Sequence, residues 1–242
     1  MPRTPASLRA LLANLIDYAG LYPPAALPLP EVLKNYEAYL ISPEVWMLNR
    51  LVLSATKLPE LCLGENWRVT LLVDAEPGSL PPQVETLETK LPQRLSLPTY
   101  CEAPIAAILG AFAKIRTGGL TPEAVPSSAA IADFLCAAAA RRIAFKATAG
   151  LHHPIRSVTM HGFVNVFVAA AFAWQGADRA SIVDILDETN ARAFDFREGE
   201  LRWGRRPMTT ADITSARRNF AHSFGSCSFE EPAAQLRALG WL

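Results

Sequence analysis

Strand-like and helix-like runs alternate along most of this chain, and that alternation limits the fold more than any other feature. The strand-like runs are NLIDYA (14–19), MLNRLVLS (47–54), WRVTLLVD (67–74), RLSLPTYCE (94–102), FAKIRT (112–117) and RIAFKAT (142–148). The helix-like runs lie between them at 30–40, 82–91, 103–111 and 127–142. Such alternation indicates βαβ units around a parallel sheet, either a closed barrel or an open doubly wound sheet.

Length and one missing motif favour the closed barrel over the open sheet. The chain has 242 residues, close to the usual size of a single (β/α)8 barrel. No G-x-G-x-x-G follows the first strand-like run, which weighs against a dinucleotide-binding open sheet. We therefore expect an α/β protein with one (β/α)8, TIM-type barrel domain over residues 1–242.

The alternation loosens after residue 160, so the last two βα units are expected to be irregular. Helical spacing, turn residues and a threonine N-cap guide the assignment there. The expected elements are an apolar helix, a second helix, a hairpin turning at Glu198-Gly199, a third helix, a final strand and a last helix, at 161–174, 178–189, 193–203, 209–220, 222–229 and 230–242.

Composition excludes several classes of function. The 23 basic and 23 acidic residues give zero formal net charge, which argues against binding nucleic acid or an anionic membrane. The most apolar run, 162–174, is too short to span a bilayer, and no secretory signal is present at the start. The four cysteines are scattered, without the close pairs of zinc sites. We expect a soluble, cytoplasmic protein.

Three basic residues on neighbouring strands are expected to share the barrel lumen. Side chains alternate between the two faces of a strand. If Phe145 packs on the outer helices, Lys146 and Thr148 face the lumen; the same parity places Lys114 and Arg116 there. An excess of buried positive charge is costly unless a bound anion or a neutral lysine relieves it. A functional use of the three cations is therefore favoured over a structural one.

Acidic residues end several of the other strands. Asp17 closes the first run and Glu102 ends the fourth, whereas Arg50 lies midway along the second. The carboxyl ends of barrel strands carry the active site, so these side chains are candidates for catalysis or substrate binding. For each of them, a structural salt bridge in the lumen is an equally good interpretation.

The three cations predict a chemistry as well as a place. A lysine with cationic neighbours in a partly desolvated site has a lowered pKa. More of Lys146 would then be the free amine, which attacks carbonyls to form a Schiff base. The same cations could instead clamp a phosphate or carboxylate without any covalent step.

The segment FKATAGL resembles the Lys-Thr-x-Thr-Gly motif of class I aldolases of the deoxyribose-phosphate aldolase type. That family carries its Schiff-base lysine on the sixth barrel strand, and RIAFKAT is the sixth strand expected here. The resemblance implies the Schiff-base role for Lys146, with Thr148 and Gly150 matching the Thr-Gly pair. Ala147 replaces the first threonine. No lysine follows Lys146, so Lys114 would substitute for the family's second lysine.

Over its whole length the chain resembles a group of bacterial proteins that share longer segments. These segments are IDYAGLYPPA, AKIRTGG, FKATAGLHHP and FGSCSF. They are far more specific than the aldolase motif. The resemblance implies no activity, so it adds no role to any residue.

Three of the four histidines, His152, His153 and His161, lie within ten residues of one another. Such clustering suggests a metal site, although the spacing matches no standard frame. The preferred interpretation is that His153 is a general acid or base near the mouth of the barrel. We predict neither a metal nor another cofactor, and keep a metal-dependent hydrolase or isomerase as an alternative.

Two glycine-bearing turns and one helix complete the predictions. Gly118 and Gly119 follow the fifth strand, and Gly225 and Ser226 lie in the turn after the last one, where backbone N–H groups can hold an anion. Ordinary tight turns are the alternative. A helix at 163–174 that is apolar all round must be covered, either by a second copy of the chain or by its own C-terminal segments.

Together these features predict a lyase that resembles class I aldolases and acts on a small anionic carbonyl metabolite, with a phosphorylated one as an option. Lys146 would form the imine, Lys114 and Arg116 would lower its pKa and hold the anion, and Asp17 or Glu102 would shuttle protons. A barrel that binds a small anionic ligand without chemistry is a further alternative.

Overall fold

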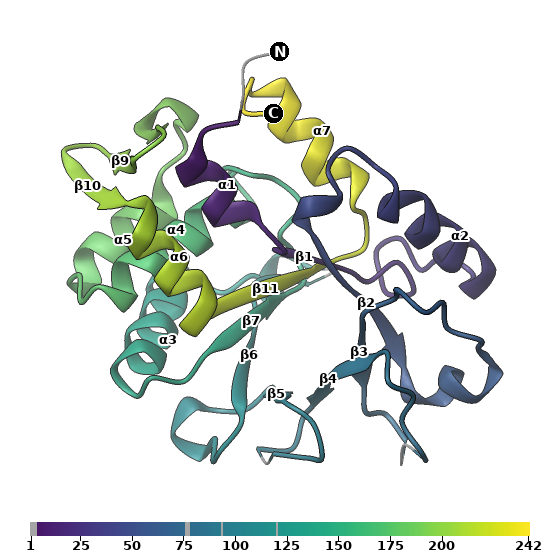
Figure 1. Cartoon of the computed structure of the whole chain (residues 1–242). Coiled ribbons are helices and arrows are strands. Elements are labelled where there is room, and N and C mark those ends of the chain that lie inside the picture. The colour runs from purple at the N-terminus through teal and green to yellow at the C-terminus, as the bar shows by residue number, and fades with distance from the viewer. Residues whose placement is uncertain (1–3, 76–77, 93, 120) are drawn as a thin grey trace.

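Eight parallel strands close into a barrel in the computed structural model, which describes residues 4–75, 78–92, 94–119 and 121–242 (Figure 1). Around the barrel the strands follow chain order. They are β1 (Ile16–Tyr18), β2 (Leu48–Ser54), β3 (Val69–Leu72), β4 (Val84–Thr89), β5 (Thr99–Cys101), β6 (Phe112–Arg116), β7 (Phe145–Thr148) and β11 (Ala221–Ser226). The predicted α/β barrel is confirmed. Lys146, however, lies on the seventh barrel strand and not on the sixth.

The helices are distributed unevenly around this barrel. They are α1 (Ala6–Leu12), α2 (Leu29–Leu40), α3 (Ser128–Ala140), α4 (Phe163–Trp174), α5 (Arg179–Asp187), α6 (Thr210–Asn219) and α7 (Glu230–Ala238). Figure 1 shows α3 to α6 gathered beside β6, β7 and β11, whereas loops connect β3, β4 and β5. In the described chain between β2 and β6, the only helical segments are the 3-10 turns Ala55–Glu60 and Ile105–Ala107.

Two predicted helices are therefore wrong. The segment 103–111 contains only a 3-10 turn, and the segment 82–91 contains β4. The β-branched residues Val84, Thr86 and Thr89 favour a strand, and all three are buried between neighbouring strands. This error matters because β4 carries an acid, Glu88, that points into the lumen.

The irregular part of the barrel is the connection from β7 to β11. After α4 and α5 the chain forms a three-stranded antiparallel sheet of β8 (Phe194–Phe196), β9 (Glu200–Trp203) and β10 (Arg206–Thr209). The predicted hairpin is confirmed as β8 and β9, and β10 is an additional strand. Thr209 caps α6 by accepting a hydrogen bond from the Asp212 N–H at 3.1 Å, as the sequence predicts.

Helix α4 is buried on every side within the single chain. Its residues 163–173 are all buried, against α3, α5, α6 and β11. Phe163 stacks on Phe224 with ring centroids 5.3 Å apart. Of the two covers predicted for this helix, the chain's own segments are the one observed. This burial means that residues 163–173 need no second copy to cover them, and a homo-oligomer through 163–174 stays a prediction.

One helical stretch, Pro122–Ala140, has the length and apolar composition of a membrane span. Its α3 part packs on α4 and α5, and Ile131, Ala132 and Leu135 are completely buried there. This packing is that of a core helix in a barrel domain. Localisation to the cytoplasm stays a prediction.

Candidate active site in the barrel lumen

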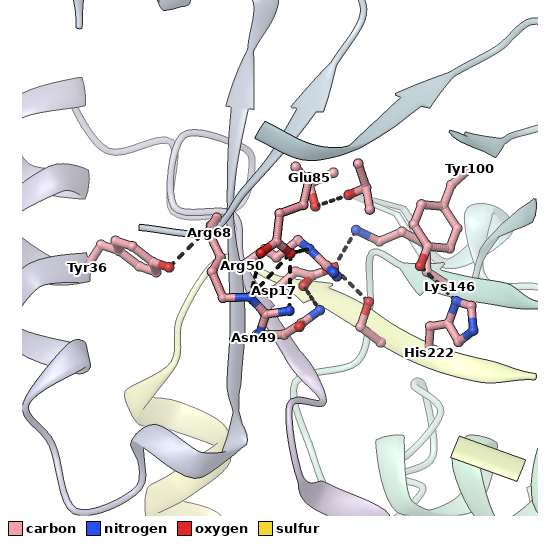
Figure 2. A network of polar contacts seen from close by, with 12 residues as sticks. Asp17, Tyr36, Asn49, Arg50, Arg68, Glu85, Tyr100, Lys146 and His222 are labelled. Atoms are coloured by element: carbon pink, nitrogen blue, oxygen red, sulfur yellow. Dashed lines mark hydrogen bonds and ion pairs between the residues drawn. The ribbon is translucent and has the colours of Figure 1, made fainter. Parts of the chain in front are cut away.

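The lumen contains a lysine between two carboxylates. Lys146 on β7 is 1% exposed, and its Nζ lies 2.5 Å from Asp17 Oδ2 on β1 and 2.5 Å from Glu88 Oε1 on β4. Strand parity places all three side chains inside the barrel. Figure 2 shows Lys146 reaching across the lumen toward Asp17. The predicted meeting of Lys146 and Asp17 therefore occurs, with Glu88 as an unforeseen third member.

A second lysine joins this cluster through the same glutamate. Lys114 Nζ lies 2.8 Å from Glu88 Oε2 and 3.5 Å from Glu102 Oε2. Lys114 stands beside Lys146 in the register of β6 and β7, so Glu88 receives one ammonium on each oxygen. Glu102 is 27% exposed, which makes it the most accessible acid of the cluster.

Neutral side chains complete the surroundings of Asp17. The Asn49 amide donates to Asp17 Oδ1 at 2.6 Å, and the Ser223 hydroxyl donates to Oδ2 at 2.7 Å. The Tyr100 ring lies 5.6 Å from Lys146 Nζ, a distance at which its face attracts the ammonium. These contacts orient the Asp17 carboxylate, because each of its two oxygens accepts a hydrogen bond.

The balance of charge in the lumen reverses the pKa predicted for Lys146. Burial alone would lower that pKa, but the charges of Asp17 and Glu88 outweigh burial and raise it above its usual value. Burial likewise opposes ionisation of Glu88, yet the charges of Lys146 and Lys114 lower its pKa. The predicted lowering of the lysine pKa by cationic neighbours is therefore wrong. In the resting site Lys146 is an ammonium.

Arg116 does not belong to the buried cluster. It is the last residue of β6, two positions beyond Lys114, and its side chain is exposed. The predicted trio of buried cations thus reduces to two, with Arg116 at the carboxyl-terminal mouth. Within the described chain Arg116 has no ion-pair partner. Thr148, the last residue of β7, is partly buried at the same end.

The two glycine-bearing turns that were predicted to bind an anion pack closely against other parts of the chain. A Cβ added at Gly118 would lie 2.8 Å from the Gly150 Cα, so these two glycines let two backbones cross closely. Gly119 faces the Ala124 Cβ, and Gly225 faces Thr148. The Ser226 hydroxyl accepts from the Ser228 N–H at 3.4 Å. An anion site in these turns stays a prediction, and close packing already accounts for Gly118.

The three clustered histidines have separate partners. His152 and His153 contact α7, through Glu231 at 3.3 Å and Gln235 at 2.8 Å. His161 is buried, and its Nε2 donates to the Pro126 carbonyl at 2.7 Å. The described residues contain no group of three or more His, Cys, Asp or Glu side chains placed to hold a metal. The general acid or base role of His153 stays a prediction.

Tyr22 is a functional candidate that the sequence did not indicate. It follows β1 at the carboxyl-terminal mouth, and its hydroxyl is buried without a hydrogen-bond partner in the described chain. Burial raises the pKa of Tyr22, and the nearby charges of Glu88 and Asp74 raise it further. An unpaired buried hydroxyl costs roughly 1–3 kcal/mol, so its position beside the charged cluster needs an explanation.

Arg50 lies away from the lysines, in a second ion-pair cluster toward the amino-terminal mouth. Its Nε lies 2.8 Å from Glu85 Oε2, and Arg68 binds the same carboxylate at 3.0 Å. Figure 2 shows this cluster beside Asp17 and Asn49. Arg50 therefore does not join the predicted anion site at the carboxyl-terminal mouth.

Comparison of the chain with protein-family models, curated proteins and solved structures finds no match. The fold and the lumen define the class: a closed α/β barrel with an ion-paired lysine among carboxylates. Any more particular assignment depends on what this arrangement does chemically.

Proposed function

We propose that the chain is a lyase of the class I aldolase type, in which Lys146 forms an imine with a small carbonyl metabolite. The observation that carries this proposal is the position of Lys146 Nζ, 2.5 Å from each of two buried carboxylates. Carboxylates that hold an ammonium also stabilise the iminium cation that replaces it at the same nitrogen.

The imine step conserves atoms and charge without an external proton. Lys146 passes one proton to Asp17 or Glu88, and the free amine attacks the carbonyl carbon. The resulting carbinolamine loses its oxygen as water, taking both hydrogens from the original ammonium, and leaves a protonated imine. The cost of the step lies in removing the first proton, because the pKa of Lys146 is raised by its two carboxylate partners.

The protonated imine then serves as the electron sink for breaking a carbon–carbon bond. Glu102 accepts the proton of the substrate's β-hydroxyl, the bond between the α and β carbons breaks, and its electrons move to the nitrogen to form an enamine. An aldehyde leaves. The enamine takes a proton back at its α carbon, and water then hydrolyses the imine. Glu102 suits this role because it is the cluster's most exposed acid.

Two residues at the carboxyl-terminal mouth support binding of an anionic carbonyl compound. Arg116 is exposed there and, in the described chain, carries no counter-charge. The Tyr22 hydroxyl is buried, has no hydrogen-bond partner among the described residues, and suits a substrate oxygen. We expect Tyr22→Phe to leave folding unchanged and to raise the carbonyl concentration needed for half-maximal imine formation about tenfold, the value of one lost hydrogen bond.

A barrel that only binds a ligand is the second candidate, favoured by one observation. Lys146 is 1% exposed and both of its charge partners are in place, as in a purely structural ion pair. In that case the lumen lysine supports the fold and performs no chemistry.

Reduction with borohydride separates the two candidates. The chain would be incubated with small aldehydes, ketones and sugar phosphates, reduced, and weighed by intact-mass spectrometry. The lyase proposal predicts an adduct on the wild type and none on Lys146→Arg, which keeps the positive charge but forms no imine. If no carbonyl compound gives an adduct, Lys146 is a structural ion-pair member.

A further inference from the structure

A cleft opens at the amino-terminal mouth of the barrel, opposite Arg116 and Glu102. Its walls include Asn14 just before β1, Pro98 just before β5 and Phe112 at the start of β6. Its volume is about 520 Å³. Sites for small molecules span roughly 300–1,000 Å³, so the cleft can hold a metabolite.

Three barrel strands are irregular at this cleft. Between β1 and β2 the extra residue falls at Asn49 or Arg50; β4 has Glu85 as an extra residue against β3; and β11 has His222 against β7. All of these residues line the cleft. Bulges redirect side chains and concentrate at barrel rims and beside sites. Three such irregularities around one opening turn these side chains toward the cleft, as expected beside a ligand site.

The cleft has an excess of positive charge. Among the described residues, three guanidinium groups line it, those of Arg50, Arg217 and Arg218, against the single carboxylate of Glu85. Glu85 is shared between Arg50 and Arg68. All donors of Arg217 bind backbone carbonyls, such as that of Leu11 at 2.8 Å, so Arg217 contributes charge alone.

Arg50 and Arg218 retain donors that can bind a ligand. Arg50 uses its Nε on Glu85, and its two terminal nitrogens have no partner among the described residues. Arg218 is exposed and, within the same residues, forms no ion pair. Guanidinium groups bind phosphate and carboxylate oxygens in pairs, which fits two such groups around one opening.

His222 reports the positive potential of the cleft. Its pKa is lowered to about 4, mainly by burial and in addition by the charges of Arg217 and Arg50. The neutral ring accepts a hydrogen bond from the Tyr100 hydroxyl at 2.8 Å. His222 thus neither offsets nor adds to the charge that an anion would meet.

We propose that this cleft is a second ligand site, which binds the phosphate or carboxylate group of a small metabolite through Arg50 and Arg218. The site does not depend on the lyase proposal. One residue connects the site with the lumen cluster: Asn49 lines the cleft and donates a hydrogen bond to Asp17. A ligand in the cleft therefore contacts the residue that orients the carboxylate partner of Lys146.

The four histidines make the site testable by NMR, since His222 lies in the cleft whereas His152 and His153 contact α7. Inorganic phosphate is titrated at constant pH and ionic strength while the ring signals are followed, with His222→Gln to assign the cleft signal. Malonate replaces phosphate in a parallel series. Saturable shifts of His222 with either anion support the site, and the tighter one identifies the head group.

Arg218→Gln tests the contacts, because an exposed residue can be changed without loss of the fold. We expect phosphate affinity at His222 to fall about tenfold, as for loss of one charge-assisted contact. Arg192→Gln, at an exposed arginine elsewhere, should leave the affinity unchanged. The proposal is overturned if neither anion shifts His222 saturably, if only His152 and His153 respond, or if Arg218→Gln binds as the wild type does.

Discussion

Strand β4 carries two glutamates, and each binds two cations. The cations that bind Glu88 are buried, whereas those that bind Glu85 are partly exposed to solvent. Glu88 is 5% exposed and binds Lys146, which is 1% exposed. Glu85 is 35% exposed and binds Arg68, which is 41% exposed. The bonds are of similar length, so burial is the difference between the clusters. Water weakens the outer pairs, whereas the inner charges depend entirely on one another.

The comparison teaches that two glutamates of one strand contribute differently to the protein, according to how far each ion-pair cluster is buried. In the lumen, removing Lys146 leaves Asp17 without a cation and Glu88 with only one, in a low-dielectric interior. At the amino-terminal mouth, solvent replaces a lost partner at little cost, and arginines keep donors free for a ligand. Each prediction below breaks or sharpens this contrast.

The largest effect should come from Lys146→Met, which leaves Asp17 and Glu88 buried without their shared cation. We expect the free energy of unfolding to fall by about 3–5 kcal/mol, measured by urea denaturation. Adding Asp17→Asn to this variant should recover part of the loss, because Asp17 is then the carboxylate without a cation, whereas Glu88 keeps Lys114. A loss below about 1 kcal/mol would show that the lumen cluster is solvated like the outer one.

Acid should destabilise the protein through His222 by a slightly smaller amount. The folded pKa of His222, about 4, lies below its usual 6.5, so its contribution is fully present above pH 6.5 and is lost as pH falls toward 4. The shift corresponds to about 3 kcal/mol. Chemical denaturation of the wild type and His222→Gln at pH 7 and pH 4.5 measures it. Equal pH dependence of the two proteins would contradict the assignment.

The rate of imine trapping should change little with pH, because the proton that Lys146 loses passes to a neighbouring carboxylate and not to bulk water. The pKa of Lys146 is raised, so the ammonium that supplies this proton predominates at neutrality and above it. Initial rates of borohydride-trapped adduct between pH 7 and pH 9 measure this dependence. A rate that rises about tenfold per pH unit would mean that Lys146 loses its proton to bulk water, and it would contradict the internal transfer.

The smallest effect should come from Arg68→Gln in the outer cluster. Arg68 is 41% exposed and Glu85 keeps Arg50, so the expected loss of unfolding free energy is below about 1 kcal/mol. Added salt should change the free energy of unfolding of the wild type and of the variant by the same amount, because solvent already screens the pair that the variant lacks. The measurement is urea denaturation at low and high salt, beside Lys146→Met.

The alternation of side chains along the strands allowed several of the charged residues in the lumen to be predicted. The parity of FAKIRT and RIAFKAT placed Lys114 and Lys146 inside, because a regular strand leaves no other choice. Asp17 was predicted because it lies near the carboxyl end of a strand, where a barrel carries its active site. The barrel itself followed from the alternation of elements, even though several βα units lack a helix.

The other half could not be predicted, for two physical reasons. Glu88 lies in a run of polar and β-branched residues whose helix and strand signals compete, and the wrong choice reversed the sign of the charge around Lys146. At Asn49 or Arg50, at Glu85 and at His222 the strands gain a residue, so parity no longer indicates the face. Tyr22 depends on a loop path that only the folded chain defines.

Mapping the reduced adduct to a residue tests the central claim most directly. The chain has five lysines, Lys34, Lys57, Lys90, Lys114 and Lys146. After trapping with the carbonyl compound that reacts best, proteolysis and peptide mass spectrometry locate the added mass. A Schiff-base lyase predicts the label on Lys146 alone, although it is the least exposed cation of its cluster. Label spread over the other lysines, with Lys146 unmodified, would contradict it.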